Sequence, residues 1–127
     1  VPLERIAHHV RGHNANSVGI ELVNRGRYPD WWHTTSQDQV EPFAAAQVEA
    51  LVTLLRFLRD GLPALSRVTG HEQLDRTRIA ATDDASRTVL RKRDPGPGFP
   101  WDHVLDRSGL LWWDGAPAPS EERPDAS

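Results

Sequence analysis

The chain has 127 residues, of which 15 are basic and 18 acidic, and it carries a formal net charge of −3. This length predicts a single domain, and the charge balance offers no basic field for nucleic acid. No apolar run approaches the roughly 18 residues needed to span a bilayer, and the absence of cysteine excludes disulfides and thiolate metal ligands.

The first sixteen residues open on Val1-Pro2-Leu3, which is typical of the end of a strand. We therefore expect the true N-terminus, with any targeting segment, to lie upstream. His8, His9 and His13 follow within six positions. They are interpreted either as part of a polar surface loop or as metal ligands. The surface loop is favoured, because ligand pairs need a defined spacing on one element.

Residues 17–23 alternate apolar and other side chains and include β-branched residues, which predicts a β-strand. Glu21 is a carboxylate in this otherwise apolar stretch. Burying it without a partner would cost several kcal/mol. It is therefore either exposed on an edge strand or a carboxylate of a functional site.

Residues 24–42 predict an irregular segment, because they contain glycine, proline and a run of hydroxyl side chains. A loop of this length in a small domain is more often functional than idle. Trp31 and Trp32 lie in it. They are interpreted either as the lining of a groove for sugar or peptide, or as hydrophobic pins that hold the loop.

Residues 43–60 predict the clearest helix of the chain. Apolar residues recur there at steps of three and four, and polar residues cover the opposite side. Pro42 suits the first helical turn, and Gly61 with Pro63 ends the helix. The apolar stripe, which we assign to the core, is Val48, Leu51, Leu55, Leu58 and Leu62.

Beyond this helix the expected elements are short. Val68 and Thr69 predict a strand that ends at His71, and residues 73–90 form an excursion without strong periodicity. Asp83 and Asp84 in the excursion are interpreted as a loop cap rather than a ligand pair. Residues 101–105 predict a short helix or turn. Residues 114–127 are expected to be a disordered polar tail, which leaves 1–113 as the domain.

The stretch from Arg91 to Trp101 contains Lys92, the only lysine of the chain, and Asp94 two residues later. Pro95-Gly96-Pro97 follows at once and excludes both helix interior and central strand. We expect a rigid loop that presents the side chains of Lys92 and Asp94. Together with His71 on a second ordered loop, they predict a metal-dependent hydrolase site.

Three stretches, taken in order, resemble the zinc-dependent N-acetylmuramoyl-L-alanine amidases, the AmpD-like branch related to the peptidoglycan recognition proteins. The resemblance covers residues 1–105. It implies an α/β fold with a mixed central β-sheet flanked by helices, of which this chain is the larger, C-terminal part and lacks the N-terminal strands. The stretches are Ser17-Val18-Gly19-Ile20-Glu21-Leu22, Thr69-Gly70-His71-Glu72, and Lys92-Arg93-Asp94-Pro95-Gly96-Pro97 running into Phe99-Pro100-Trp101.

The resemblance also implies roles for individual residues. His71 and Asp94 match two ligands of a zinc ion (Zn2+), Glu21 and Lys92 match the essential glutamate and lysine, and His9 matches a histidine near the groove. No position matches the first zinc histidine of the family, so the third ligand is expected from a segment upstream of this chain. The run between His71 and Asp94 is also longer than in some members.

The function implied is hydrolysis of the amide bond between the lactyl group of N-acetylmuramic acid and L-alanine in peptidoglycan or muropeptides. The expected partners are this substrate and an N-terminal segment that completes the zinc site. A rival function is a peptidoglycan-binding module of the same fold that lacks a complete zinc site. A third, weaker interpretation is an unrelated α/β hydrolase-like fragment without metal. The sequence leaves open the compartment, the oligomeric state, and whether the substrate is intact cell wall or recycled fragments.

Overall fold

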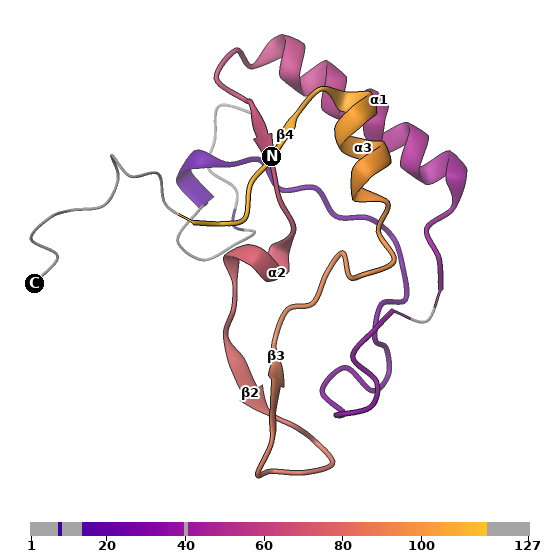
Figure 1. The fold of residues 1–127 in the computed structure, drawn as a ribbon, viewed down its shortest axis with the longest axis vertical. Helices are drawn as coiled ribbons and strands as arrows, with labels where there is room; N and C mark the ends of the chain where they lie inside the picture. Colours follow the sequence, from indigo (N-terminus) through magenta and orange to yellow (C-terminus); the bar gives the residue numbers. More distant parts are fainter. Residues whose placement is uncertain (1–7, 9–13, 40, 117–127) are drawn as a thin grey trace, which may run out of the picture.

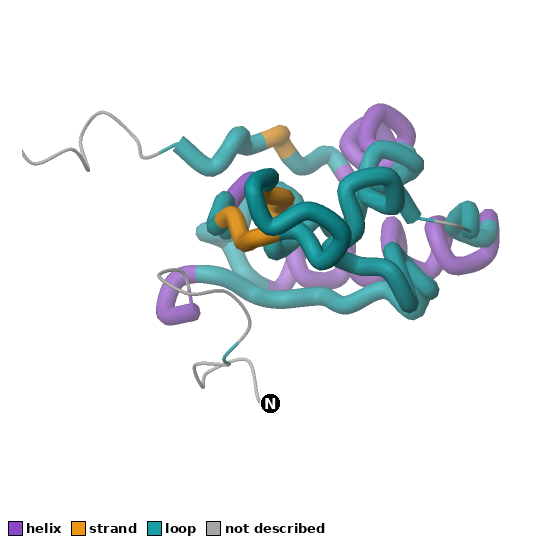
Figure 2. Tube along the Cα trace, turned by 90° about the horizontal axis from the view of Figure 1, so that it is seen from below, coloured by secondary structure: helices purple, strands orange, loops and turns teal. Residues whose placement is uncertain are grey.

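The computed structural model describes residue 8, residues 14–39 and residues 41–116 (Figure 1). His9, His13 and most of the predicted polar tail lie outside these ranges. Most of the described residues lie in loops and turns rather than in helices or strands (Figure 2). In chain order the elements are η1 (Asn14–Asn16), α1 (Ala45–Gly61), β1 (Arg67–Val68), α2 (His71–Leu74), β2 (Arg78–Ala80), β3 (Thr88–Leu90), α3 (Trp101–Ser108) and β4 (Leu111–Trp112). In the part of the chain that is described, no helix has the length and apolar character to cross a membrane.

Helix α1 forms where the apolar spacing predicts it, although it begins at Ala45 rather than at 43. Pro42 therefore precedes the helix instead of occupying its first turn. The helix ends at Gly61, as predicted, and Leu62 beyond it is half-buried. Four of the five predicted core residues are buried, namely Val48, Leu51, Leu55 and Leu58, and Val52, which was not predicted, is buried with them.

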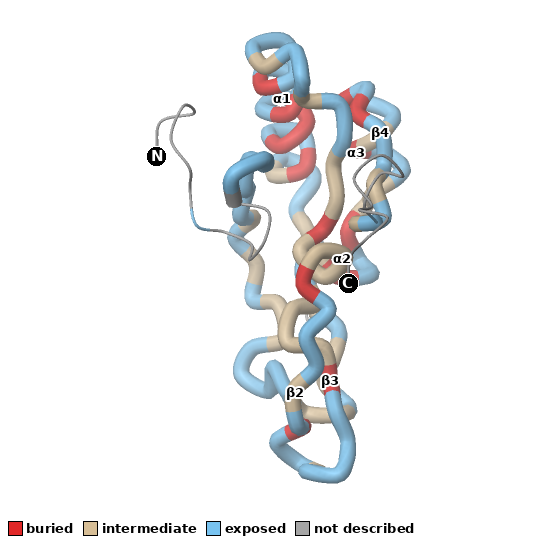
Figure 3. Tube along the Cα trace, turned by 90° about the vertical axis from the view of Figure 1, so that its left-hand side faces the viewer, coloured by how far each residue is buried: buried red, intermediate tan, exposed pale blue. Residues whose placement is uncertain are grey.

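The core lies between α1 and α3, where the buried residues gather (Figure 3). The last carbonyls of α3 have no hydrogen-bond donors within their own helix, and two arginines of α1 donate to them. Arg56 donates to the carbonyl of Arg107 at 2.8 Å, and Arg59 to that of Ser108 at 2.7 Å. The buried core cluster is Val48, Leu51, Val52, Leu55, Phe99, Val104 and Leu110.

The strands form two separate two-stranded sheets. Strand β1 pairs with β4 in parallel, and β2 pairs with β3 antiparallel, with Ile79 opposite Val89. The predicted mixed α/β class is confirmed. The described residues do not form the single central sheet that was expected. The excursion at 73–90 contains a regular β-hairpin. Its strands are too short for their alternation to be recognised in the sequence.

The prediction of a strand over 17–23 is wrong for the described structure. Residues 17–23 have no regular secondary structure, and Val18 and Ile20 are exposed. A strand needs a neighbour to share its backbone hydrogen bonds, and no described segment pairs with this one. One of the apolar residues of this segment, Leu22, nevertheless packs against the core cluster.

The loop at 24–39 lies against the β2–β3 hairpin (Figure 1). The amide of Thr82 donates to the carbonyl of Trp32 at 2.9 Å. Asp83 accepts hydrogen bonds from the amide and the hydroxyl of Thr34 at 2.9 and 2.6 Å. Asp84 caps its own turn through Ser86. The interpretation as caps is therefore confirmed for Asp84, whereas Asp83 connects two loops.

Candidate active site

His71 and Asp94 meet where helix α2 begins. His71 is the first residue of α2, and Asp94 lies on the loop between β3 and α3. The Nδ1 atom of His71 is 3.2 Å from Oδ2 of Asp94. The backbone connects the same two segments, because the amide of Glu72 donates to the carbonyl of Asp94 at 3.2 Å. The pair expected from the sequence is thus in direct contact.

Gly70 makes this approach possible. A Cβ atom at position 70 would lie 2.8 Å from Cδ of Pro95 and 3.3 Å from the ring of Trp101. Contacts of this kind leave no room for a side chain at position 70. The glycine before His71 therefore allows the loop that carries Asp94 to pass directly over the start of α2.

The loop that carries Asp94 is fixed at both ends. At its C-terminal end, Phe99 is buried in the core and stacks edge-on against Trp101, with ring centroids 4.5 Å apart. At its N-terminal end, the guanidinium of Arg27 donates to the carbonyls of Leu90 and Arg91, each at 3.0 Å. The rigid loop predicted from the prolines and glycines therefore also depends on contacts from distant parts of the chain.

An ion pair between a buried carboxylate and a half-buried arginine supports the same region. Asp75, at the end of α2, accepts a hydrogen bond from the Arg91 guanidinium and another from the amide of Thr77 at 3.1 Å. Burial acts to raise the pKa of Asp75, but the hydrogen bonds from Thr77 and Arg91 outweigh it and lower the pKa to about 2. Asp75 is therefore ionised at neutral pH and connects α2 to the end of β3.

The charge state of Asp94 follows from its neighbours. Partial desolvation acts to raise its pKa, but the hydrogen bond with His71 and the charges of His71 and Lys92 outweigh it, so the pKa lies below its ordinary value. The side chain of Asp94 is 64% exposed and that of His71 is 22% exposed. The side chain of Asp94 is therefore largely open to solvent and that of His71 is partly so, and the carboxylate is ionised.

The separation of the two atoms suits a metal ion. Two ligands of a tetrahedral zinc ion, each about 2.0–2.1 Å from the metal, are about 3.3 Å apart. The nitrogen and oxygen here are 3.2 Å apart. A zinc site also needs a third protein ligand. Within the described ranges, no group of three histidine, aspartate or glutamate side chains is arranged to hold a metal.

The other predicted site residues differ in how close they lie to this pair. Glu21 is exposed, and among the described residues it makes no hydrogen bond or ion pair. Lys92 is half-buried and close enough for its charge to act on Asp94. His8 is exposed, and His9 falls outside the described ranges. The structure brings together His71, Asp94 and Lys92, and leaves Glu21 without a contact to them.

Trp31 and Trp32 form an exposed aromatic group with Tyr28. The ring centroids of Tyr28 and Trp31 are 6.0 Å apart, and those of Trp31 and Trp32 are 6.4 Å apart. The exposed fractions are 58%, 49% and 38% for Tyr28, Trp31 and Trp32. Such exposure favours a surface for a ligand over pins buried under the loop.

Sequence reasoning missed a network of charges around the pair. Arg93 contacts Asp38 at 3.2 Å and Glu72 at 3.7 Å. Burial raises the pKa of Glu72, while burial and then repulsion by Arg93 lower the pKa of Arg27. No local pattern indicates this network, since Arg27 and Asp38 come from a loop far away in sequence. The only sign of this network in the sequence is the number of arginines between residues 87 and 93.

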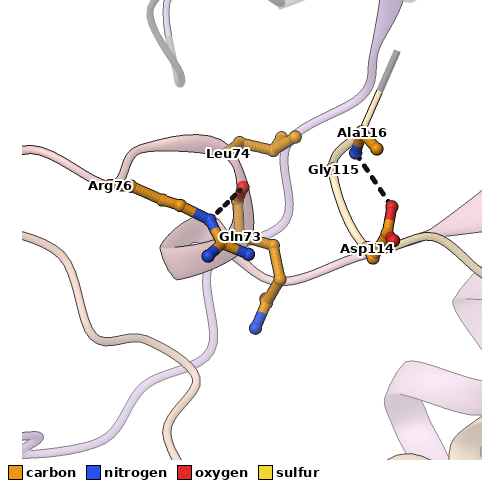
Figure 4. A pocket seen from close by; sticks show the side chains of 6 residues that line it. All are labelled: Gln73, Leu74, Arg76, Asp114, Gly115 and Ala116. Atoms are coloured by element: carbon orange, nitrogen blue, oxygen red, sulfur yellow. Dashed lines mark hydrogen bonds between the residues drawn. The ribbon is translucent and has the colours of Figure 1, made fainter.

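Two hollows lie near the site. The larger, of about 460 Å³, lies between α2 and residues 114–116 and does not include His71 or Asp94 (Figure 4). The smaller, of about 230 Å³, lies between the loop at 24–39 and the hairpin, and Arg93 lines it. Arg93 directly precedes Asp94, whereas the larger hollow is lined by Gln73 and Leu74 of the helix that begins at His71.

Comparisons with known proteins agree with the sequence motifs. Residues 1–97 match the family described as N-acetylmuramoyl-L-alanine amidase. The chain is 31% identical over 101 residues to N-acetylmuramoyl-L-alanine amidase AmiD of Escherichia coli (strain K12). The match covers 80% of this chain and 31% of that protein, so the chain spans about a third of the length of the curated relative it matches. No solved structure matches.

Proposed function

The chain belongs to the N-acetylmuramoyl-L-alanine amidase family, and from this membership we propose that it carries part of the active site of a zinc-dependent amidase. The bond cut joins the lactyl group of N-acetylmuramic acid to L-alanine. The observation that carries the proposal is the contact between His71 and Asp94 at 3.2 Å. We also propose the fold of these amidases for the chain, with a central sheet that N-terminal strands complete.

His71 and Asp94 would hold the zinc ion, with a third ligand from residues outside the described ranges or outside this chain. When bound, zinc supplies Lewis-acid activation of water and of the substrate carbonyl. The depressed pKa of Asp94 suits this role, because a carboxylate binds metal in its ionised form. The exposure of both side chains leaves room for a substrate to approach.

In the reaction, the water oxygen adds to the lactyl carbonyl carbon, the bond from that carbon to the alanine nitrogen breaks, and a proton passes to the nitrogen. Lys92 stabilises the negative charge that develops on the carbonyl oxygen. Glu21 accepts the proton of water and passes it to the leaving amine. The family resemblance is what supports the role of Glu21, since its exposed carboxylate makes no contact with the pair.

A second function has one observation in its favour. The described residues supply two metal ligands rather than three, which suits a module that binds peptidoglycan without cutting it. Such a module would retain the protein on insoluble peptidoglycan and release no peptide.

The test is incubation of the protein with an N-acetylmuramoyl-L-alanyl peptide in the presence of zinc, with mass spectrometry of the products. We expect a peptide with a free L-alanine amine. Asp94→Ala should release almost none, whereas Asp102→Ala, which alters an exposed aspartate of α3, should behave as the wild type. Retention on peptidoglycan without any release by the wild type would support the binding module and overturn the amidase.

A further inference from the structure

The smaller hollow is lined mainly by polar and basic side chains, and we name it the arginine cleft. Its volume is about 230 Å³, below the roughly 300–1,000 Å³ of pockets that enclose drug-sized ligands. It therefore suits a short part of a larger substrate. The charged and polar lining residues are Arg78, Arg87, Arg93, Thr34, Gln37 and Thr88, and no aspartate or glutamate lines it.

Two of the three guanidinium groups are held in place by the fold. Arg78 lies on β2 and donates across the hairpin to Thr88, to its hydroxyl at 2.9 Å and its carbonyl at 2.7 Å. Arg93 is held by ion pairs with Asp38 at 3.2 Å and Glu72 at 3.7 Å. An arginine held in this way presents its remaining donors in a fixed direction, which suits a carboxylate.

Arg87 has donors to spare. Its side chain is exposed and makes no hydrogen bond or ion pair with the described residues, although its charge helps to lower the pKa of Asp84. The carboxylate of Asp84 accepts its hydrogen bonds from Ser86 rather than from Arg87. Arg27 adds a further positive charge next to Arg93. The lining of the cleft thus holds three arginines and no carboxylate, and among the described residues only Arg93 of the three has ion pairs, with Asp38 and Glu72 outside the lining.

The cleft adjoins the proposed reaction centre. Arg93 directly precedes Asp94, so their Cα atoms are about 3.8 Å apart. The Arg93 guanidinium also contacts Glu72, the residue after His71. A substrate whose scissile bond lies at the His71–Asp94 pair therefore has an adjoining part within reach of the cleft.

The chemistry of the substrate decides which part that is. The lactyl carboxyl group of muramic acid is consumed in the amide bond, so it carries no charge. The peptide that begins with L-alanine carries at least one carboxylate, at its own C-terminal end or on an acidic side chain. Negative charge therefore lies on the peptide side of the scissile bond.

We propose that the arginine cleft binds a carboxylate of the substrate peptide and so selects acidic peptides over neutral ones. This inference rests on the proposed function and adds a binding site for the leaving part of the substrate. Arg87 and Arg78 contact the carboxylate, and Arg93 connects the cleft to Asp94. The role is one of binding and positioning, and no bond is made or broken in the cleft.

The test compares two ligands that differ in charge alone. One is an N-acetylmuramoyl-L-alanyl tripeptide with free carboxylates, and the other is the same compound with its carboxylates converted to primary amides. Arg87→Gln is the main variant, because the side chain of Arg87 has no hydrogen bond to the described residues that the substitution would remove. Arg87→Lys restores the charge, and Arg76→Gln is the matched control, since Arg76 is exposed on the same excursion and outside the cleft.

With the wild type we expect a lower KM for the acidic compound than for the amidated one. Arg87→Gln should raise the KM of the acidic compound roughly 3- to 10-fold, as expected for one charged contact. Its kcat, and the KM of the amidated compound, should stay close to wild type. Arg87→Lys should recover most of the loss, and Arg76→Gln should change neither KM.

A calorimetric measurement keeps this inference separate from the amidase proposal. The free acidic tripeptide and its amidated form are titrated into the wild type and into Arg87→Gln. Without any cleavage, weaker binding of the acidic form to Arg87→Gln would still support the cleft. Equal binding of both forms to wild type and variant would overturn it, and so would cleavage of both muramoyl compounds with equal KM.

Discussion

At the residue scale, Asp94 has neighbours that fix both its position and its charge. Its carbonyl accepts from the amide of Glu72, its carboxylate contacts His71, and Lys92 acts on it from two residues away. These contacts hold an ionised carboxylate 3.2 Å from an imidazole nitrogen. This is the electronic state and the spacing that a zinc ion needs.

Lys92→Ala tests the proposed stabilisation of the carbonyl oxygen. Loss of one donor to a developing oxyanion lowers kcat by about 10²- to 10³-fold. We expect that loss in the peptide-release assay, with unchanged zinc content by mass spectrometry, because Lys92 is not a proposed ligand. Wild-type kcat in Lys92→Ala would remove this residue from the mechanism.

Asp75→Asn tests the ion pair with Arg91. The pKa of Asp75 is about 2 in the folded protein against an ordinary value of 3.8. A depressed pKa stabilises the fold above the ordinary value, and the stabilisation is lost as pH falls through the folded value. The difference corresponds to roughly 2 kcal/mol. We therefore expect Asp75→Asn to lose about 2 kcal/mol of unfolding free energy near pH 7.

Urea denaturation followed by tryptophan fluorescence measures this loss as a function of pH. The difference between wild type and Asp75→Asn should shrink as pH falls from about 4 towards 2. Asp60→Asn is the control, because Asp60 is 75% exposed in its pair with Arg59 and should change stability little. A difference that stays constant over this pH range would show that the pair does not act through ionisation of Asp75.

Several residue assignments follow from the sequence, and others do not. The His71–Asp94 pairing is predictable because both residues stand in short motifs that resemble those of a known family. The position of Glu21 is not, since it depends on what the segment around it packs against. The arginine cleft depends on Arg78 and Arg87 facing the loop at 24–39, a tertiary relation that no local pattern reveals.

At the element scale, the loop at 24–39 and the β2–β3 hairpin form the two walls of the cleft. Asp83 is the main polar connection between them, through Thr34 and, at 3.6 Å, through His33. Asp84, its neighbour in sequence, bonds within its own turn. Two adjacent aspartates thus have different structural roles, and this difference can be tested.

Asp83→Ala should loosen the loop, whereas Asp84→Ala should leave it in place. Hydrogen exchange measured by mass spectrometry should show faster exchange of the Thr34 and Thr82 amides in Asp83→Ala, because the first loses its acceptor and the second loses its docked partner loop. Asp84→Ala should speed exchange of Ser86 alone in this region. Identical exchange of Thr34 in both variants would contradict the assignment.

Helices and strands differ in how far the sequence determines them here. Helix α1 is predictable because its hydrogen bonds are internal and its apolar spacing is local. The segment at 17–23 has the composition of a strand but lacks a partner among the described residues. The strands β2 and β3 span three residues each, too short for alternation to be recognised.

At the scale of the whole molecule, the core and the candidate site share one segment. The stretch from Asp94 to Trp101 begins at the histidine contact and ends in the cluster between α1 and α3. Phe99 also meets Phe43 before α1, with ring centroids 5.4 Å apart. Packing of the core therefore sets the position of Asp94.

The zinc content of the purified protein tests the central claim most directly. After dialysis of the full-length protein against zinc and then against metal-free buffer, inductively coupled plasma mass spectrometry should find about one zinc ion per chain in the wild type. His71→Ala and Asp94→Ala should each retain little zinc, while Asp102→Ala should retain as much as the wild type. Full zinc content in both His71→Ala and Asp94→Ala, or a wild type that cleaves its substrate at full rate after zinc has been removed, would contradict the account.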